Sequence, residues 1–303
     1  MPNSPPTLTI TAVICSNRPG AGLVDAVLSI AASTRVPEEI VVVAQFAPSL
    51  WVDSQLKALE TRGLLRVVFD SGRGLSRARN IAIRAVTTTH LLWTDDDCIV
   101  APSWVEAHIS AYEAHPDAAL IFGSVDPPSA VNGGYVPTFD VEEELGTWST
   151  QSGAASGMGA NMSFPMSLIQ KIGDFDERFG VGAVLGSGED LEFSMRARAK
   201  GFKVIGIRSA RVVHEGGVRP MGSESNTIWY RDGMGMGAVL FESFRREDWV
   251  GSALILRSVT GLMADSAWRL LTRKTPTGAR MAAHLFRGSA IGFAKALRES
   301  MSS

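Results

Sequence analysis

Three consecutive aspartates, Asp95, Asp96 and Asp97, are the residues that point most directly to chemistry. They follow an apolar run at 91–93, which predicts a buried strand that ends at the aspartates. Ligands of open α/β sheets bind beyond the carboxyl ends of strands, and three adjacent carboxylates repel one another unless a cation lies between them. Mg²⁺ or Mn²⁺, bound together with substrate phosphates, would be such a cation. The alternative is an acidic turn that caps the helix expected from Pro102.

A second acidic pair, Glu189 and Asp190, opens a helical pattern over 191–200 after a glycine-rich turn. The helix dipole stabilises acids at this position, and one of them could act as a general base if the fold aims it into a cleft. Capping of the helix is the commoner role for an isolated acidic pair. His214 follows an expected short strand and precedes two glycines, so it could ligate a metal or be structural.

Arginines gather near the start of a helix expected over 75–86. Arg73, Arg77 and Arg79 could bind an anion together with the free N–H groups of the helix start. The alternative is a solvated basic face. The spacing is not that of a P-loop, and no GxGxxG follows the first strand, which disfavours a nicotinamide-dependent dehydrogenase.

The first two-thirds of the chain alternates apolar runs with helical patterns. This order predicts a single, mostly parallel sheet with helices on both faces, as in Rossmann-like folds. We expect strands at 8–14, 39–44, 65–69, 90–94, 118–122, 204–207 and 211–213, and helices at 23–32, 75–86, 102–114 and 191–200. Residues 145–170 carry no charge, and we expect most of them to form a mobile loop that faces the substrate.

The chain after about residue 221 has a helical pattern and a different charge. Residues 251–303 contain eight basic and two acidic residues, a charge of +6, whereas the rest carries −8. We therefore expect a catalytic domain at 1–220 and a helical extension at 221–303. Its apolar stripes could lie on an anionic membrane, or pack against the catalytic domain or a second subunit. The stripes are Leu254, Val259, Leu262, Met263 and Ala283, Phe286, Ala290, Phe293.

Composition excludes several classes of protein. With 303 residues, 20% charged and 45% hydrophobic, the chain is an ordinary globular protein. A net charge of −2 gives no basic field for nucleic acid, and two cysteines, Cys15 and Cys98, exclude a disulfide scaffold. We expect no signal sequence, because residues 1–6 are polar and proline-rich, and no membrane-spanning helix, because no run of about 20 apolar residues is present. We expect a cytoplasmic protein, free or peripheral at the cytoplasmic face of a membrane.

The order of these motifs resembles the family 2 glycosyltransferases of the GT-A fold. The resemblance spans about 8–217 and rests on 13–19, 74–80, the three aspartates, 159–164, 173–180, 188–190 and His214. It implies a GT-A fold and an inverting enzyme that moves a sugar from a nucleoside-diphosphate sugar to an acceptor hydroxyl. The acceptor would be a carbohydrate or lipid-linked, in the synthesis of a polysaccharide or glycoconjugate.

The resemblance also implies roles for individual residues. Asp97 and His214 would hold Mn²⁺ or Mg²⁺, and Asp190 would be the catalytic base. Asn161, Gly188 and Glu189 would border the acceptor, and residues 229–235 would form a loop or helix over that side. Residues expected to bind the nucleotide sugar are Cys15, Asn17, Arg18, Gln45, Arg77, Arg79, Asp95 and Asp96.

Two positions depart from the family pattern. The acid that usually follows the second strand and contacts the nucleobase is replaced here by Ala44 and Gln45. Gln45 can still donate and accept hydrogen bonds. Ser16 stands where an aromatic residue often stacks on the base. The family's preference for uracil or thymine is therefore not implied for this chain.

Two other functions compete with sugar transfer. A nucleotidyltransferase that makes sugar nucleotides would need a basic glycine-rich loop after the first strand, which residues 17–22 only faintly suggest. It would release pyrophosphate, whereas a glycosyltransferase releases a nucleoside diphosphate. A non-catalytic sugar-nucleotide-binding module would need no base, so the acid at Asp190 argues against it.

Overall fold

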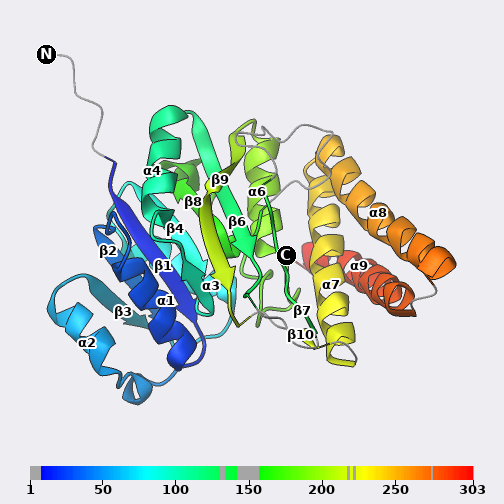
Figure 1. Ribbon diagram of the computed structural model, residues 1–303. Helices are drawn as coiled ribbons and strands as arrows, with labels where there is room; N and C mark the ends of the chain where they lie inside the picture. The colour runs from blue at the N-terminus through cyan, green and yellow to red at the C-terminus, as the bar shows by residue number, and fades with distance from the viewer. Residues whose placement is uncertain are drawn as a thin grey trace, which may run out of the picture.

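The structure is a computed structural model that describes residues 8–129, 134–141, 157–216, 219–220, 223–273 and 276–302. An eight-stranded sheet covered by helices is followed by three long C-terminal helices (Figure 1). The strands are β1 (Ile10–Ser16), β2 (Glu39–Ala44), β3 (Leu65–Phe69), β4 (His90–Asp95), β5 (Cys98–Val100), β6 (Ala118–Asp126), β8 (Met162–Pro165) and β9 (Lys203–His214), with β7 (Gly134–Tyr135) and β10 (Arg219–Pro220) as a separate pair.

The helices bury the two faces of the sheet separately. In β1, Ile10, Ala12 and Ile14 face one core and Val13 faces the other, because successive side chains alternate across a strand. Three helices pack in the first core, namely α1 (Ala21–Ala31), α2 (Ser54–Thr61) and α4 (Trp104–Ala114). The second takes α3 (Leu75–Ala85), α5 (Met166–Ile172) and α6 (Glu189–Ala199). Burial on both faces explains the continuous apolar run of β2.

The sheet is mixed, in the order β3-β2-β1-β4-β8-β6-β9-β5. The pairs β3–β2, β2–β1, β1–β4 and β6–β9 are parallel, whereas β8 and β5 pair antiparallel with their neighbours. The expected mostly parallel sheet is thus confirmed for its N-terminal half. The parallel strands β1, β2 and β4 all end at one edge, which is where their connecting loops meet.

Two expectations about local structure are wrong. The strands expected at 204–207 and 211–213 are one strand, β9, which pairs with β6 through a register shift between Gly123 and Ser124. Much of the loop expected over 145–170 is structured, since the turn η2 (Gly159–Asn161), β8 and most of α5 fall inside it. Uncharged residues there fill the sheet and its core; the remainder of that segment, up to residue 156, lies outside the described residues.

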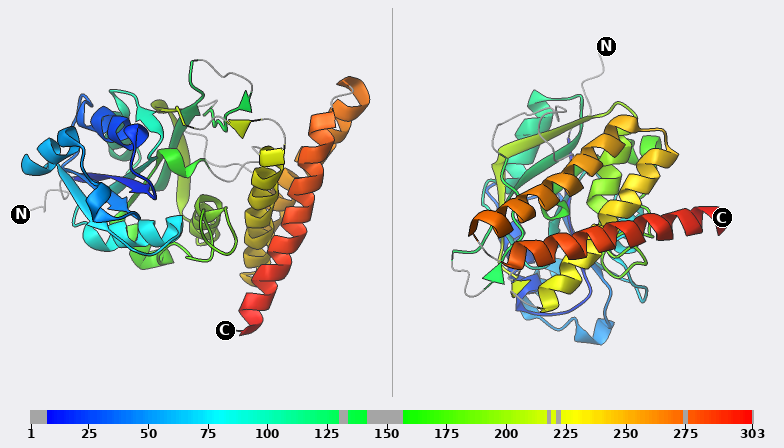
Figure 2. Two further views of the ribbon diagram at one scale, coloured as in Figure 1. Left: turned by 90° about the horizontal axis from the view of Figure 1, so that it is seen from below. Right: turned by 90° about the vertical axis from the view of Figure 1, so that its right-hand side faces the viewer.

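The C-terminal helices are α7 (Ser223–Arg245), α8 (Trp249–Arg273) and α9 (Pro276–Ser302). They form a layer beside the sheet domain in which α7 lies nearest the sheet (Figure 2). A third apolar core joins α7, α8 and α9 to α6 and the loop before it. No helix in the described residues combines the length and apolar character needed to cross a bilayer.

Candidate active site

A cavity of about 820 Å³ opens over the carboxyl ends of β1, β2 and β4. The register aligns Cys15 of β1 with Asp95 of β4, so these strands end together and their loops meet. The start of α3, the loop before α6, the end of β9 and α7 complete the wall. Its described lining is Cys15, Ser16, Asn17, Arg18, Gln45, Arg73, Gly74, Leu75, Asp95, Asp96, Asp97, Val181, Gly182, His214, Ile228 and Arg231.

Asp97 and His214 form a charged pair in this wall. β5 pairs Cys98 with His214, so the imidazole Nε2 lies 3.3 Å from Asp97 Oδ1. Burial alone would raise the pKa of Asp97, but the His214 hydrogen bond and the His214 and Arg18 charges outweigh it and lower that pKa. Burial alone would lower the pKa of His214, and Asp97 in turn raises it.

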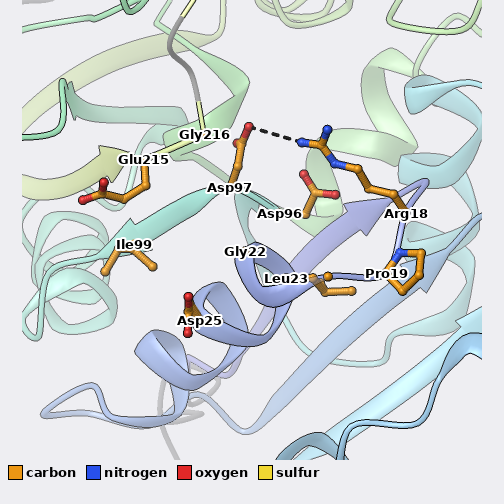
Figure 3. A pocket seen from close by; sticks show the side chains of 11 residues that line it. Arg18, Pro19, Gly22, Leu23, Asp25, Asp96, Asp97, Ile99, Glu215 and Gly216 are labelled. Atoms are coloured by element: carbon orange, nitrogen blue, oxygen red, sulfur yellow. Dashed lines mark ion pairs between the residues drawn. The ribbon is translucent and has the colours of Figure 1, made fainter. Parts of the chain in front are cut away.

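This pair fits a divalent cation. Among the described residues, ligand atoms of Asp97, Cys98 and His214 all lie within 4.8 Å of one another. A carboxylate oxygen suits Mg²⁺ or Mn²⁺, an imidazole nitrogen suits a transition-metal ion better than Mg²⁺, and a thiol suits softer ions. Burial strongly raises the pKa of Cys98, so its sulfur stays protonated. Asp97 also pairs with Arg18 at 3.8 Å, beside an adjoining cavity of about 560 Å³ that shares Arg18, Asp96 and Asp97 (Figure 3).

The other two aspartates are more deeply buried. Burial raises the pKa of Asp95 to about 6, although the charge of Arg79 opposes this rise. Asp96 accepts a hydrogen bond of 2.5 Å from the Ser16 hydroxyl, and burial raises its pKa as well. Burial likewise raises the pKa of the Cys15 thiol to about 12, so this side of the cavity presents a neutral thiol.

Arg79 lies in the protein interior and is not among the described residues that line the cavity. Its guanidinium is 2% exposed, pairs with Glu189 at 3.2 Å and lies over the rings of Trp93 and Phe175. The contact of Arg79 with the nucleotide stays a prediction, and the structure shows a structural role for this side chain. Arg79 ties α3 to the first residue of α6, since burying either charge alone would be costly.

Glu189 and Asp190 begin α6. The N-cap residue Gly188 has φ +85°, a left-handed conformation that glycine adopts without strain. Burial and the neighbouring Asp190 charge raise the pKa of Glu189 to about 7. Asp190 is half-buried, and its two oxygens accept the N–H groups of Gly159 (2.9 Å) and Leu191 (2.7 Å).

Asp190 lines neither cavity within the described residues. Its charge and the charge of Asp95 nevertheless both act on the buried Arg79. The two acidic motifs therefore flank a single guanidinium, although about ninety residues separate them in the sequence.

Gln45 lies in the cavity wall within a network of fixed partners. Its amide donates to Asp70 Oδ2 (3.0 Å) and to the Gly74 carbonyl (3.3 Å). Arg77 holds Asp70 with two hydrogen bonds of 3.0 Å and thereby lowers the pKa of Asp70 to about 2. Arg77 itself does not line the cavity in the described part of the chain, so it orients Gln45 through Asp70.

Asn161 is fully buried and its polar atoms are all used. Its amide donates to the carbonyls of Ser124 and Ala210, and its oxygen accepts from Trp104 at 2.8 Å and contacts His108 at 3.0 Å. The acceptor contact that the sequence predicts for Asn161 stays a prediction. In the structure, Asn161 anchors the η2 turn, whose first residue binds Asp190.

Several lining residues were absent from the predicted site residues, among them Val181 and two residues of α7, Ile228 and Arg231. The sequence analysis placed Arg231 only in a segment expected over the acceptor side. An arginine in a long amphipathic helix has no local signal that separates it from a solvated one. Asp70 was missed for the same reason, since only the pairing of β2 with β3 brings it to Gln45.

Sequence comparison assigns the family. The profile described as "Glycosyl transferase family 2" matches residues 11–172, more than half of the chain. The chain belongs to glycosyltransferase family 2. A relative from Haloferax volcanii, a glucosyl-dolichyl phosphate glucuronosyltransferase, is 28% identical over 119 residues. That match covers 37% of this chain and 37% of the relative, so this family 2 chain matches little more than a third of the relative's length.

Solved structures share the GT-A fold with this family 2 glycosyltransferase. A mannosyltransferase from Pyrobaculum calidifontis, solved with GDP-Man and Mn²⁺, has a TM-score of 0.62 at 15% identity and covers 94% of this chain and 86% of its own. GalNAc-T7, solved with UDP, GalNAc and Mn²⁺, has a TM-score of 0.57 at 17% identity, and the match covers 78% of this chain and 48% of GalNAc-T7. S. aureus TarS 1–349 has a TM-score of 0.53 at 14% identity, and the match covers 97% of this chain and 92% of the TarS chain.

Proposed function

We propose that this family 2 chain transfers a sugar from a nucleoside-diphosphate sugar to an acceptor hydroxyl, with inversion of the anomeric carbon. The observation that carries the proposal is the cavity that gathers Asp95, Asp96, Asp97, His214 and Gln45 over one edge of the sheet. The fold neighbours solved with GDP-Man, UDP and UDP-GlcNAc support this donor class.

Asp97 and His214 would hold a divalent ion, Mn²⁺ or Mg²⁺. When bound, the ion supplies positive charge for the diphosphate, whose negative charge grows as the bond to the sugar breaks. Asp95 and Asp96 face the same end of the cavity, where they would orient the donor. Arg18 adds a positive charge, since its exposed side chain lies 3.8 Å from Asp97.

Asp190 is proposed as the base that takes the proton of the acceptor hydroxyl. Each carboxylate oxygen accepts one backbone N–H, which fixes its direction and leaves further lone pairs for the incoming proton. Glu189 remains paired with Arg79, so it would border the acceptor without acting as the base. Attack from the face opposite the leaving group inverts the anomeric centre in one displacement.

The nucleoside would lie at the other end of the cavity. Gln45 lines that wall, and Arg77 acts there through Asp70. Asn17 also lines the cavity and Cys15 lies beside Asp95, where both would contact the nucleotide sugar. Gln45 has both amide hydrogens engaged, so its carbonyl oxygen is the group left to accept from a base. An N–H group on the base edge is therefore the feature that Gln45 would recognise.

We also propose that residues 1–220 are the catalytic part and 221–303 a helical extension. One face of α9 is exposed along its length and pairs apolar side chains with arginines, as on a helix that lies on an anionic lipid surface. The exposed face consists of Arg280, Ala283, Phe286, Arg287, Ala290, Ala294, Leu297, Arg298 and Met301. A peripheral, cytoplasmic location and a carbohydrate or lipid-linked acceptor complete the proposal.

A donor screen tests the proposed activity. The full-length protein is incubated with UDP-, GDP-, dTDP- and CMP-sugars and Mn²⁺, and thermal stability and released products are measured. A bound donor stabilises the folded state by mass action. Nucleoside diphosphate released when an acceptor is present supports sugar transfer. In a separate incubation with nucleoside triphosphates and sugar 1-phosphates, released pyrophosphate would indicate a nucleotidyltransferase. Activity should disappear in EDTA and return with Mn²⁺ or Mg²⁺; full activity without metal would contradict the role given to Asp97 and His214.

A further inference from the structure

Helix α7 places a positive charge in the wall of the donor cavity. Arg231 and Ile228, one turn apart, line the cavity together with the motif aspartates. Gly235, one turn further on, lies against the backbone of Ser187 and Gly188, where a Cβ would meet the Ser187 carbonyl at 2.6 Å. The same face of α7 therefore holds both Arg231 and the segment that leads into Asp190.

The Arg231 guanidinium forms fewer hydrogen bonds with the described residues than its donors allow. Its Nε is buried without a hydrogen-bond partner in the described part of the chain. The contact recorded for its terminal nitrogen is with the neighbouring Asp232 at 3.4 Å, which is long for a charged hydrogen bond. A buried donor without a partner is costly, so such a group commonly marks a place where a ligand completes the bonding.

The position of Arg231 is fixed from behind. A Cβ on Gly186 would lie 2.8 Å from Arg231 Cγ, so the side-chain stem packs tightly on the loop before α6. The ion pair and charges recorded for Asp97 come from His214 and Arg18 and not from Arg231. Arg231 therefore provides a further positive charge in the cavity wall, on a different element from the proposed metal ligands.

We propose that Arg231 is a donor-binding residue whose guanidinium binds anionic oxygens of the nucleotide sugar. The inference rests on the proposed function and extends it to α7, which lies outside the matched residues 11–172. The anionic oxygens belong to the diphosphate or to a carboxylate on the transferred sugar. A planar guanidinium binds two such oxygens side by side, which is why arginine suits either group.

The test is binding by isothermal titration in Mn²⁺, with uridine and guanosine ligands. For each base the monophosphate, the diphosphate, the diphosphate-glucose and the diphosphate-glucuronate are compared. Arg231→Gln removes the charge, Arg231→Lys keeps the charge but not the fork, and Arg245→Gln removes an arginine at the far end of the same helix. Melting temperatures of the ligand-free variants confirm that each folds.

The two sources of the anion predict different results. If Arg231 holds the diphosphate, Arg231→Gln weakens diphosphate binding roughly tenfold to hundredfold and leaves monophosphate binding unchanged, since hydrogen bonds to charged groups are the strong ones. If it holds a sugar carboxylate, only the glucuronate ligand is weakened. Arg231→Lys should recover part of the loss, and Arg245→Gln should match the wild type.

The remaining outcomes overturn the inference. Equal affinities of the wild type and Arg231→Gln for every ligand would refute it while leaving the proposed function intact. Failure of the wild type to bind any ligand of either series, or any donor of the wider screen proposed above, would refute the proposed function, and the role of Arg231 with it.

Discussion

Asp190 is the residue on which the proposed chemistry depends most. We expect Asp190→Asn to lower the rate of sugar transfer by about 10²–10⁴-fold, because general-base assistance contributes about that much. The amide has a similar shape, but its oxygen can accept only one of the two backbone N–H groups, because the amide nitrogen donates. Donor binding should still be retained, because Asp190 is not among the described residues that line the donor cavity. Transfer is measured as nucleoside diphosphate released with acceptor present, and binding by thermal shift. Turnover close to that of the wild type would reject Asp190 as the base.

Sequence alone could predict those site residues that stand at ends of strands. Asp95, Asp97 and His214 follow apolar runs, and the register then brings them into one cavity. The sequence could not show that Arg79 differs from an arginine that binds a ligand. Only the packing of Arg79 on Trp93 reveals that it is the buried partner of Glu189. Asn161 shows the same limit: its four contacts come from segments distant in the sequence.

Glu189 should make stability depend on pH. Its pKa is raised to about 7, chiefly by burial, above the ordinary value of 4.5. The folded protein then binds a proton that the unfolded chain has lost, so the free energy of unfolding should fall as pH rises from about 5 to 8. In Glu189→Gln this contribution is removed. The variant should lose less stability over that range, as measured by urea denaturation at several pH values.

The comparison of slopes makes the Glu189 prediction specific. Removing the carboxylate also deprives Arg79 of its partner, so the variant will be less stable at any single pH. Only the difference between the two pH profiles reports the titration. Parallel profiles would show that Glu189 titrates in its ordinary range.

At the scale of elements, periodicity located β1, β2, β4 and the flanking helices well, because their apolar residues repeat with the right spacing. It misassigned one face of α9. The expected stripe of Ala283, Phe286, Ala290 and Phe293 divides, since Phe293 packs on Phe241 and Phe244 while the other three are exposed. Glycines, which hydropathy patterns overlook, instead form the face buried against α7.

Gly237 tests this close packing of α7 on α9. A Cβ at Gly237 would lie 1.9 Å from the Ser289 carbonyl, so Gly237→Ala must push the helices apart. We expect a loss of about 1–3 kcal/mol in the free energy of unfolding, as for other overpacked cores. Gly261→Ala on α8 is the matched control: none of the described atoms lies within 4 Å of its Cβ, so it should stabilise by about 1 kcal/mol. Equal effects of the two changes in thermal unfolding would contradict this packing.

At the scale of the whole molecule, the cavity and the exposed face of α9 lie on different sides and would have different roles. The donor cavity opens at the edge of the sheet and is partly walled by α7, whereas α9 presents its arginine-bearing face away from α7. The described exposed stripe of α9 contains no acid. Two copies of this stripe facing each other would bring like charges together, which opposes a homodimer through α9. An anionic lipid surface complements the stripe in both charge and polarity.

Vesicle binding tests that orientation of the molecule. We expect the full chain to sediment with vesicles containing phosphatidylglycerol and to remain free of pure phosphatidylcholine vesicles. Binding should weaken with salt, because the Debye length falls to about 3 Å at 1 M.

Arg280→Glu with Arg287→Glu should abolish binding through charge, and Phe286→Ser should weaken it by removing an apolar side chain that is 55% exposed. Arg62→Glu, an exposed arginine on the far side of the sheet domain, is the matched control. If these α9 variants bind like the wild type, or if light scattering shows a dimer that Phe286→Ser dissociates, the stripe faces protein and not lipid.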